Sequence, residues 1–234
     1  MSPRIAIEDF ALEQLIFEVR FPTAYQLWDK AGALSEALGT TWPSLALLTA
    51  QPGNIAFRVG KSATMFAELT RAGMTLFYPG SKPDVQQISQ FFGHVREHLQ
   101  LTVLQRLGLR FLLFREFADQ ASGALAMLET GLLTLPSDRF FGGEGTPKSA
   151  EVMISVEGKG LTATFRMAMQ TRQVSIDLPL NAPPHLHDTH ESTHGLVIDV
   201  DFWTPMEVQV TQLGISDWIE QVMHVFKRDV PKLL

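Results

Sequence analysis

The chain has 234 residues, of which 45% are apolar and 19% charged, a composition that suits a globular protein and excludes a disordered or fibrous one. It contains no cysteine, which excludes disulfide bonds and thiolate metal ligands. The net charge of −6 repels a nucleic-acid backbone and no basic run offsets it, so we expect no nucleic-acid partner.

The first nine residues lack the basic and apolar segments of a signal peptide, and the apolar runs along the chain are too short to span a bilayer. We therefore expect a cytoplasmic protein that is not held in a membrane.

The first half of the chain, residues 1–105, predicts a strand, a helix, four strands and a helix. Apolar and polar residues alternate over residues 12–21, the period of a strand with one buried face. Helical spacing then predicts a helix from Thr23 to about Leu38, ended by Gly39. Short strands separated by Gly and Pro turn signals follow, and a long helix closes the half. These strands are expected at residues 44–49, 54–59, 63–69 and 74–78, and the helix at residues 84–106.

The second half, residues 106–234, predicts the same order. A strand at residues 107–117 leads to a short helix that begins after Asp119 and ends at Gly131. A last helix begins at Ser216 and carries apolar residues on one face. Four strands are expected between these helices, at residues 151–157, 161–169, 173–178 and 196–203.

Each half therefore predicts a β-α-β4-α unit, and we expect an α+β fold with an internal duplication. A curved antiparallel sheet with one apolar face needs helices over that face, and each half supplies two. The two halves can share one continuous sheet and form one compact unit. This order resembles the duplicated TATA-binding-protein-like (TBP-like) and helix-grip folds, which host unrelated functions.

Three short segments carry a family resemblance. They are residues 17–22 (FEVRFP), 108–111 (GLRF) and 196–202 (LVIDVDF), the last followed by a helix with Met223, His224 and Phe226. Together they resemble a sporadically distributed prokaryotic family of uncharacterised proteins, with an EVRFP-like first strand, a GLRY-like middle strand and an LDIDVF-like last strand. Residues 112–115 (LLFR) depart from the Ile-Asn-Arg that usually follows the middle strand. The resemblance implies no activity, because none is assigned to the family.

Two groups of histidines are candidate metal ligands. His94 and His98 lie one helical turn apart in an H-x-x-E-H pattern, which suits a zinc site but lacks an identified third ligand. The segment 185–194 (HLHDTHESTH) carries four more histidines among carboxylates. The alternatives are an exposed helix face for the first group and a solvated connection between strands for the second, and we expect no metal or other cofactor.

Charged residues on the predicted strands are candidate binding groups. Arg20 and Arg110 occupy matching places in the first strands of the two halves, where they could receive an anionic ligand or a carboxylate of a partner. The alternative is an ion pair with an acid on the same sheet face. Asp199 and Asp201 share one face of the last strand and could bind a cation, or could simply form its solvent face.

Two adjacent aromatic residues, Phe140 and Phe141, lie in the long connection at residues 135–148. They either fold back onto the body of the protein or anchor a partner, as buried aromatic residues do at interfaces.

The leading hypothesis is a non-catalytic interaction protein, such as an accessory subunit, an adaptor or an immunity-like partner of another cytosolic protein, and a homodimer is compatible with it. One alternative is a small-molecule binder with a cavity between sheet and helices. Another is a metal-dependent enzyme that uses His94 and His98 or the histidines of residues 185–194.

Overall fold

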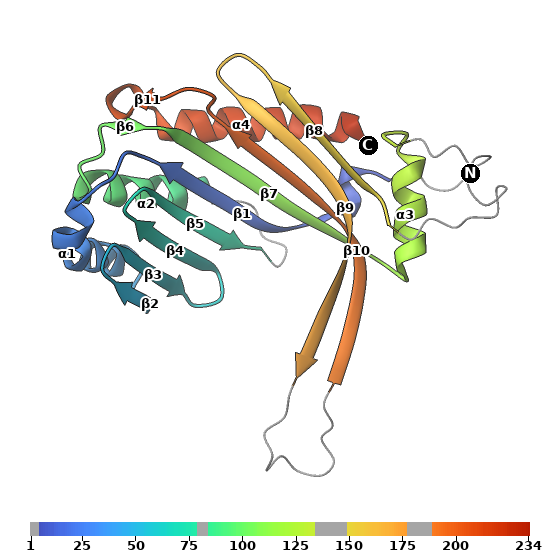
Figure 1. The fold of residues 1–234 in the computed structure, drawn as a ribbon, viewed down its shortest axis with the longest axis horizontal. Helices are drawn as coiled ribbons and strands as arrows, with labels where there is room; N and C mark the ends of the chain where they lie inside the picture. The colour runs from blue at the N-terminus through green and yellow to red at the C-terminus, as the bar shows by residue number, and fades with distance from the viewer. Residues whose placement is uncertain (1–4, 79–83, 134–148, 177–188) are drawn as a thin grey trace, which may run out of the picture.

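The computed structural model describes residues 5–78, 84–133, 149–176 and 189–234. Nine strands form its main sheet: β1 (Ala11–Arg20), β2 (Leu45–Gln51), β3 (Asn54–Val59), β4 (Ala63–Glu68), β5 (Arg71–Phe77), β7 (Arg106–Phe117), β8 (Glu151–Glu157), β9 (Thr162–Ile176) and β10 (Thr189–Trp203). Their order is β2-β3-β4-β5-β1-β7-β10-β9-β8, with every pair antiparallel (Figure 1). The strands β6 (Val103–Leu104) and β11 (Val208–Gln209) pair separately.

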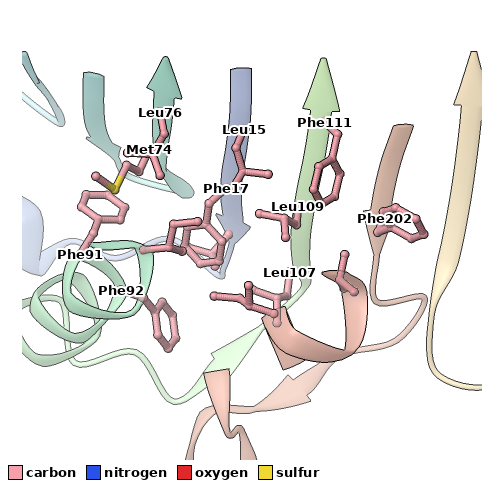
Figure 2. Packing of buried hydrophobic residues seen from close by; sticks show 14 of the residues in the cluster. Leu15, Phe17, Met74, Leu76, Phe91, Phe92, Leu107, Leu109, Phe111 and Phe202 are labelled. Atoms are coloured by element: carbon pink, nitrogen blue, oxygen red, sulfur yellow. The ribbon is translucent and has the colours of Figure 1, made fainter. Parts of the chain in front are cut away.

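The sheet carries one apolar face because its strands alternate in register. Phe17 on β1 lies opposite Leu109 on β7, and Leu15 lies opposite Phe111. All four side chains are buried, as Figure 2 shows in close-up. The pairing of β1 with β7 at the centre joins the two halves of the chain into one sheet.

Four helices complete the described fold: α1 (Gln26–Thr41), α2 (Val85–His98), α3 (Gln120–Glu129) and α4 (Ile215–Asp229). The α2 residue Phe92 packs edge-on against Phe17 at 6.1 Å, and the α4 residue Phe226 stacks on Phe111 at 4.2 Å. Phe17 and Phe111 lie on the same sheet face, so α2 and α4 cover the same apolar surface. The α+β class with an antiparallel sheet is therefore confirmed. None of the helices in the described ranges is long and apolar enough to cross a bilayer.

Two helix ends in the first half differ from their predictions. The helix α1 continues past Gly39 to Thr41 and ends one residue before the Trp42-Pro43 pair, where a following proline disfavours helical backbone. The helix α2 ends at His98 rather than at residue 106. Its end is set by Gln100, whose φ of 52° is left-handed and stops the helix.

Between α3 and α4, the described residues contain three strands of the main sheet where four were predicted. The predicted strands at residues 161–169 and 173–178 are one strand, β9, which continues through the polar residues Gln170 to Gln173. This polar run contains neither Gly nor Pro, and its backbone stays paired to β10 through Gln170↔Gly195 and Arg172↔Thr193. In the described chain the halves therefore differ in the number of strands that they give to the main sheet, five against four, and a tandem duplication stays a prediction.

Candidate functional site

The three segments of the family resemblance lie side by side in the sheet, on β1, β7 and β10. Phe111 of the middle segment contacts Phe202 of the last one edge-on at 6.0 Å and stacks on Phe226 of α4. These aromatic residues pack at the centre of the core, so the segments contribute to the packing of the sheet against α4.

A cavity of about 660 Å³ lies between the apolar sheet face of β8–β10 and the C-terminal part of α4 with η5 (Val230–Leu233). Aliphatic and aromatic side chains from the sheet and from the helix layer form its apolar walls: Ile154, Val156, Leu161, Ala163, Phe165, Val200, Phe202, Val225, Val230 and Leu233. This volume lies within the range of about 300–1,000 Å³ that is typical of small-molecule sites.

The cavity exists because the helix layer stops short of the sheet edge. Phe202 on β10, Ala163 on β9 and Val156 on the edge strand β8 are in register and line one row of the apolar face. The exposed fraction rises along this row, from 2% at Phe202 to 60% at Val156. An apolar strip of β8 and β9 therefore faces α4, and the side chains of α4 leave space above it.

Polar side chains also line this cavity. Lys159, Gln221 and His224 belong to the lining and form no hydrogen bond or ion pair with the described residues. Asp229 differs, because it accepts hydrogen bonds from Arg228 at 2.9 Å and from Lys232 at 3.2 Å. The guanidinium of Arg228 holds the pKa of Asp229 well below its usual range, with Lys232 adding to the effect. The acid of the lining is thus already paired, while Lys159, Gln221 and His224 have no partner among the described residues.

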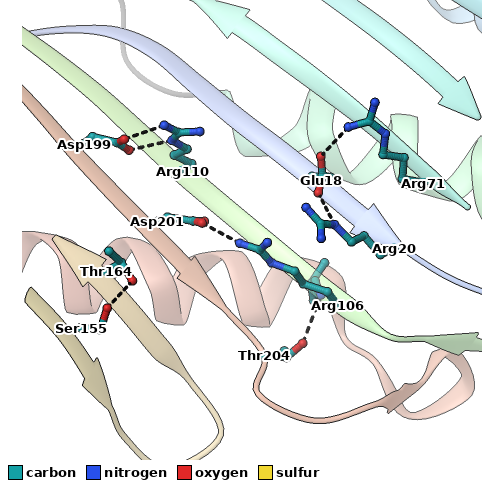
Figure 3. A network of polar contacts seen from close by, with 11 residues as sticks. Glu18, Arg20, Arg71, Arg106, Arg110, Ser155, Thr164, Asp199, Asp201 and Thr204 are labelled. Carbon is teal, nitrogen blue, oxygen red and sulfur yellow. Dashed lines mark hydrogen bonds and ion pairs between the residues drawn. The ribbon is translucent and has the colours of Figure 1, made fainter. Parts of the chain in front are cut away.

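The opposite sheet face carries ion pairs (Figure 3). Arg110 donates from Nε to Asp199 Oδ1 at 2.7 Å, and Arg106 donates to Asp201 Oδ2 at 2.6 Å. Arg20 donates to Glu18 on its own strand at 2.7 Å. Burial raises the pKa of Asp201, and its two arginine neighbours act against that rise.

Arg20 and Arg110 therefore do not meet as a matched pair. In the β1–β7 register Arg20 lies opposite Arg106, whereas Arg110 lies opposite Ile16. Each forms an ion pair with an acid on the same sheet face, as the alternative interpretation of these residues predicted. Asp199 pairs with Arg110 and Asp201 pairs with Arg106. Both acids lie on the sheet face opposite the buried Ile198, Val200 and Phe202.

The histidine pair of α2 takes part in helix packing. His94 Nε2 lies 2.8 Å from the hydroxyl oxygen of Thr41 on α1, and the ring of His94 packs edge-on against Trp42 at 6.3 Å. His98 Nδ1 lies 2.9 Å from the carbonyl oxygen of His94.

Of the second histidine group, His185 and His187 lie outside the described residues, and so do Phe140 and Phe141. His190 and His194 lie on β10 rather than in a connection, and His194 Nδ1 is 3.0 Å from the hydroxyl oxygen of Thr171. Within the ranges that the structure describes, no three His, Asp or Glu side chains gather in a metal-binding group.

The sequence signal for the cavity was incomplete. His224 entered the sequence analysis only within the family resemblance, and Lys159 did not enter it at all. The alternation of β8 did indicate that Ile154 and Val156 face away from Ser155, but it could not indicate that the helix layer would leave them uncovered.

No protein-family model matches the chain, and no curated protein matches it.

Proposed function

We propose that this chain is a non-catalytic, cytosolic binding protein whose ligand occupies the cavity between β8–β10 and α4. The observation that carries the proposal is the combination of a 660 Å³ volume, apolar walls from both layers and unpaired polar groups in the lining. The sequence suggested this function, a small-molecule binder with a cavity between sheet and helices, as an alternative hypothesis.

The ligand that fits this chemistry is an elongated apolar molecule with one anionic end, such as a fatty acid. The walls favour an alkyl chain, because burying apolar surface contributes about 25 cal/mol per Å². Lys159 and His224 are the groups that suit an anion, whereas Asp229 does not repel it strongly because Arg228 and Lys232 neutralise its charge.

The test is calorimetric titration of the chain with palmitate and with the alcohol of the same length. We expect both to bind and the acid to bind more tightly. Ala163→Phe fills the cavity from the β9 side and abolishes binding of both molecules. Lys159→Ala should weaken binding of the acid several-fold, because an exposed ion pair contributes a modest energy, and should leave binding of the alcohol unchanged.

The matched control is Lys61→Ala, which removes an exposed lysine from the turn between β3 and β4. It should leave both affinities unchanged. A wild-type chain that binds neither molecule, or an Ala163→Phe variant that binds them as the wild type does, would contradict the proposal.

A second candidate function is binding of a partner protein through the β9–β10 hairpin, and one observation favours it. Beyond the pair His194↔Phe117 the strand β10 has no β7 neighbour, yet β9 and β10 stay paired as far as Ile176↔Thr189. Figure 1 draws this part as an arm that leaves the sheet. A projecting arm suits an accessory subunit or adaptor, to which Arg20, Arg110, Phe140 and Phe141 could add contacts.

A further inference from the structure

The edge strand β2 is unprotected at one end of the sheet. One side of β2 pairs with β3, and its other side has no strand neighbour in the described chain. The strand carries no charge, and its residues Leu47 and Leu48 are 58% and 50% exposed. The opposite edge strand, β8, begins and ends with glutamate, which opposes pairing with a copy of itself. Proteins usually guard edge strands with such charges, and β2 lacks them.

One face of α1, which carries Trp28, Gly32 and Gly39, is also uncovered. Thr41 marks the side of α1 that contacts α2, through His94. At about 100° per residue, Trp28, Gly32 and Gly39 lie on the opposite side of α1. Trp28 lies beside the turn between β2 and β3, because a Cβ added at Gly53 would be 3.2 Å from Trp28 Nε1. Trp28 is 58% exposed, and a Cβ added at Gly32 or Gly39 would meet nothing within 4 Å. Glycine weakens a helix interior, and no contact within the described chain explains either one.

We propose that two copies of this chain associate through β2 and through this face of α1. A two-fold axis perpendicular to the sheet pairs β2 antiparallel with its copy and keeps both helix layers on the same side. The two α1 helices then run antiparallel, which sets the Trp28 end of one against the Gly39 end of the other. The large side chain of Trp28 on one helix thus meets Gly39, which has no side chain, on the other helix. Such a fit suits an interface between two identical surfaces.

Charge also favours a second copy as the occupant. The chain has a net charge of −6, so two copies repel each other wherever carboxylates meet. The strand β2 carries no charge, so pairing of two β2 strands avoids that repulsion, whereas Asp29 and Glu36 of α1 are exposed about one helical turn from Gly32. A register shift between Leu47 and Thr49 divides β2 into two short paired segments, and the helix face supplies the rest of the contact.

The test measures molar mass by size-exclusion chromatography with light scattering at micromolar concentration. We expect the wild type to have twice the mass of one chain. Leu47→Lys places a charge on the edge, and Gly32→Gln fills the helix face. Each should raise the dimer dissociation constant about tenfold or more. Because a Cβ at position 32 would meet nothing within 4 Å and glutamine favours a helix over glycine, Gly32→Gln should not lower the melting temperature of the monomer.

The matched control is Met153→Lys, which places the same charge at an exposed apolar residue on the other edge strand, β8. It should leave the dimer intact. A monomeric wild type, a dimer that either variant at the β2 end leaves unchanged, or a dimer that Met153→Lys dissociates would each overturn the proposal.

Discussion

His94 lies between α1 and α2 and is the histidine whose environment changes its titration most clearly. Burial lowers the pKa of His94, the positive charge of nearby His98 lowers it further, and Glu97 acts in the opposite direction. A base whose pKa is lower in the folded chain than in the unfolded chain stabilises the fold above the unfolded pKa of about 6.5 and loses that contribution as the pH falls. Protonation of His94 on acidification should therefore destabilise the fold.

The corresponding prediction compares the wild type with His94→Gln in urea unfolding between pH 7.5 and 5.5. Glutamine keeps a polar group near Thr41 but does not titrate, so the free energy of unfolding should fall less steeply with acidification in the variant. Equal slopes for the two chains would show that His94 titrates alike in the folded and unfolded states.

At the scale of elements, Arg172 connects the hairpin of β9 and β10 to the centre of the sheet. Arg172 donates from Nη1 and Nη2 to the two carboxylate oxygens of Glu13 on β1, at 2.6 and 2.7 Å, and its guanidinium lies 3.8 Å from the ring centroid of Phe114. Bidentate pairing with stacking is specific to arginine, so the side chain ties the arm to the sheet centre.

We expect Arg172→Ala to loosen the arm while leaving the body folded. Backbone amides of residues 171–176 and 189–193 should exchange hydrogen faster, and the free energy of unfolding should fall by only about 1 kcal/mol because the pair is partly exposed. Arg166→Ala, which removes an exposed pair with Glu151, is the matched control and should leave exchange in the arm unchanged. Exchange at wild-type rates in the Arg172 variant would mean that the arm needs no anchor.

Some helix and strand ends can be recognised in the sequence and others cannot. Asp119 caps α3, as the sequence predicts, and accepts a hydrogen bond from the backbone N–H of Ser122. Asp84 caps α2 in the same way. The end of α2 was missed, because glutamine at position 100 gives no sign that its backbone will be left-handed. The merging of two predicted strands into β9 was missed as well, because a polar run reads as a connection unless a partner strand lies beside it.

At the scale of the whole molecule, the cavity and the β2 edge lie at opposite ends of one nine-stranded sheet. Under the two proposals a dimer holds its two ligand sites at its outer ends, far from the shared strand pair. We therefore expect one ligand per chain, without cooperativity, and the same dissociation constant for the wild type and for Leu47→Lys. Calorimetric titration with palmitate measures both quantities. A changed affinity or a stoichiometry of one ligand per dimer would show that the two ends are coupled.

The sequence by itself determined the α+β class, the order of elements in the first half and the buried face of each central strand. These follow from local alternation, helical spacing and turn residues, which act over neighbouring positions. It also determined that Arg20 and Arg110 lie on the polar face, with an ion pair as one of two interpretations.

Only the tertiary structure decided which charged residues pair, because Arg110 meets Asp199 across 89 positions of sequence through strand register. It also decided where the helix layer ends relative to the sheet. Val156 on β8 and Leu47 on β2 are therefore exposed, although each pairs with a strand whose apolar face is covered. The cause is that uncovered apolar surface depends on how far helices extend across the sheet, a distance that no local pattern encodes.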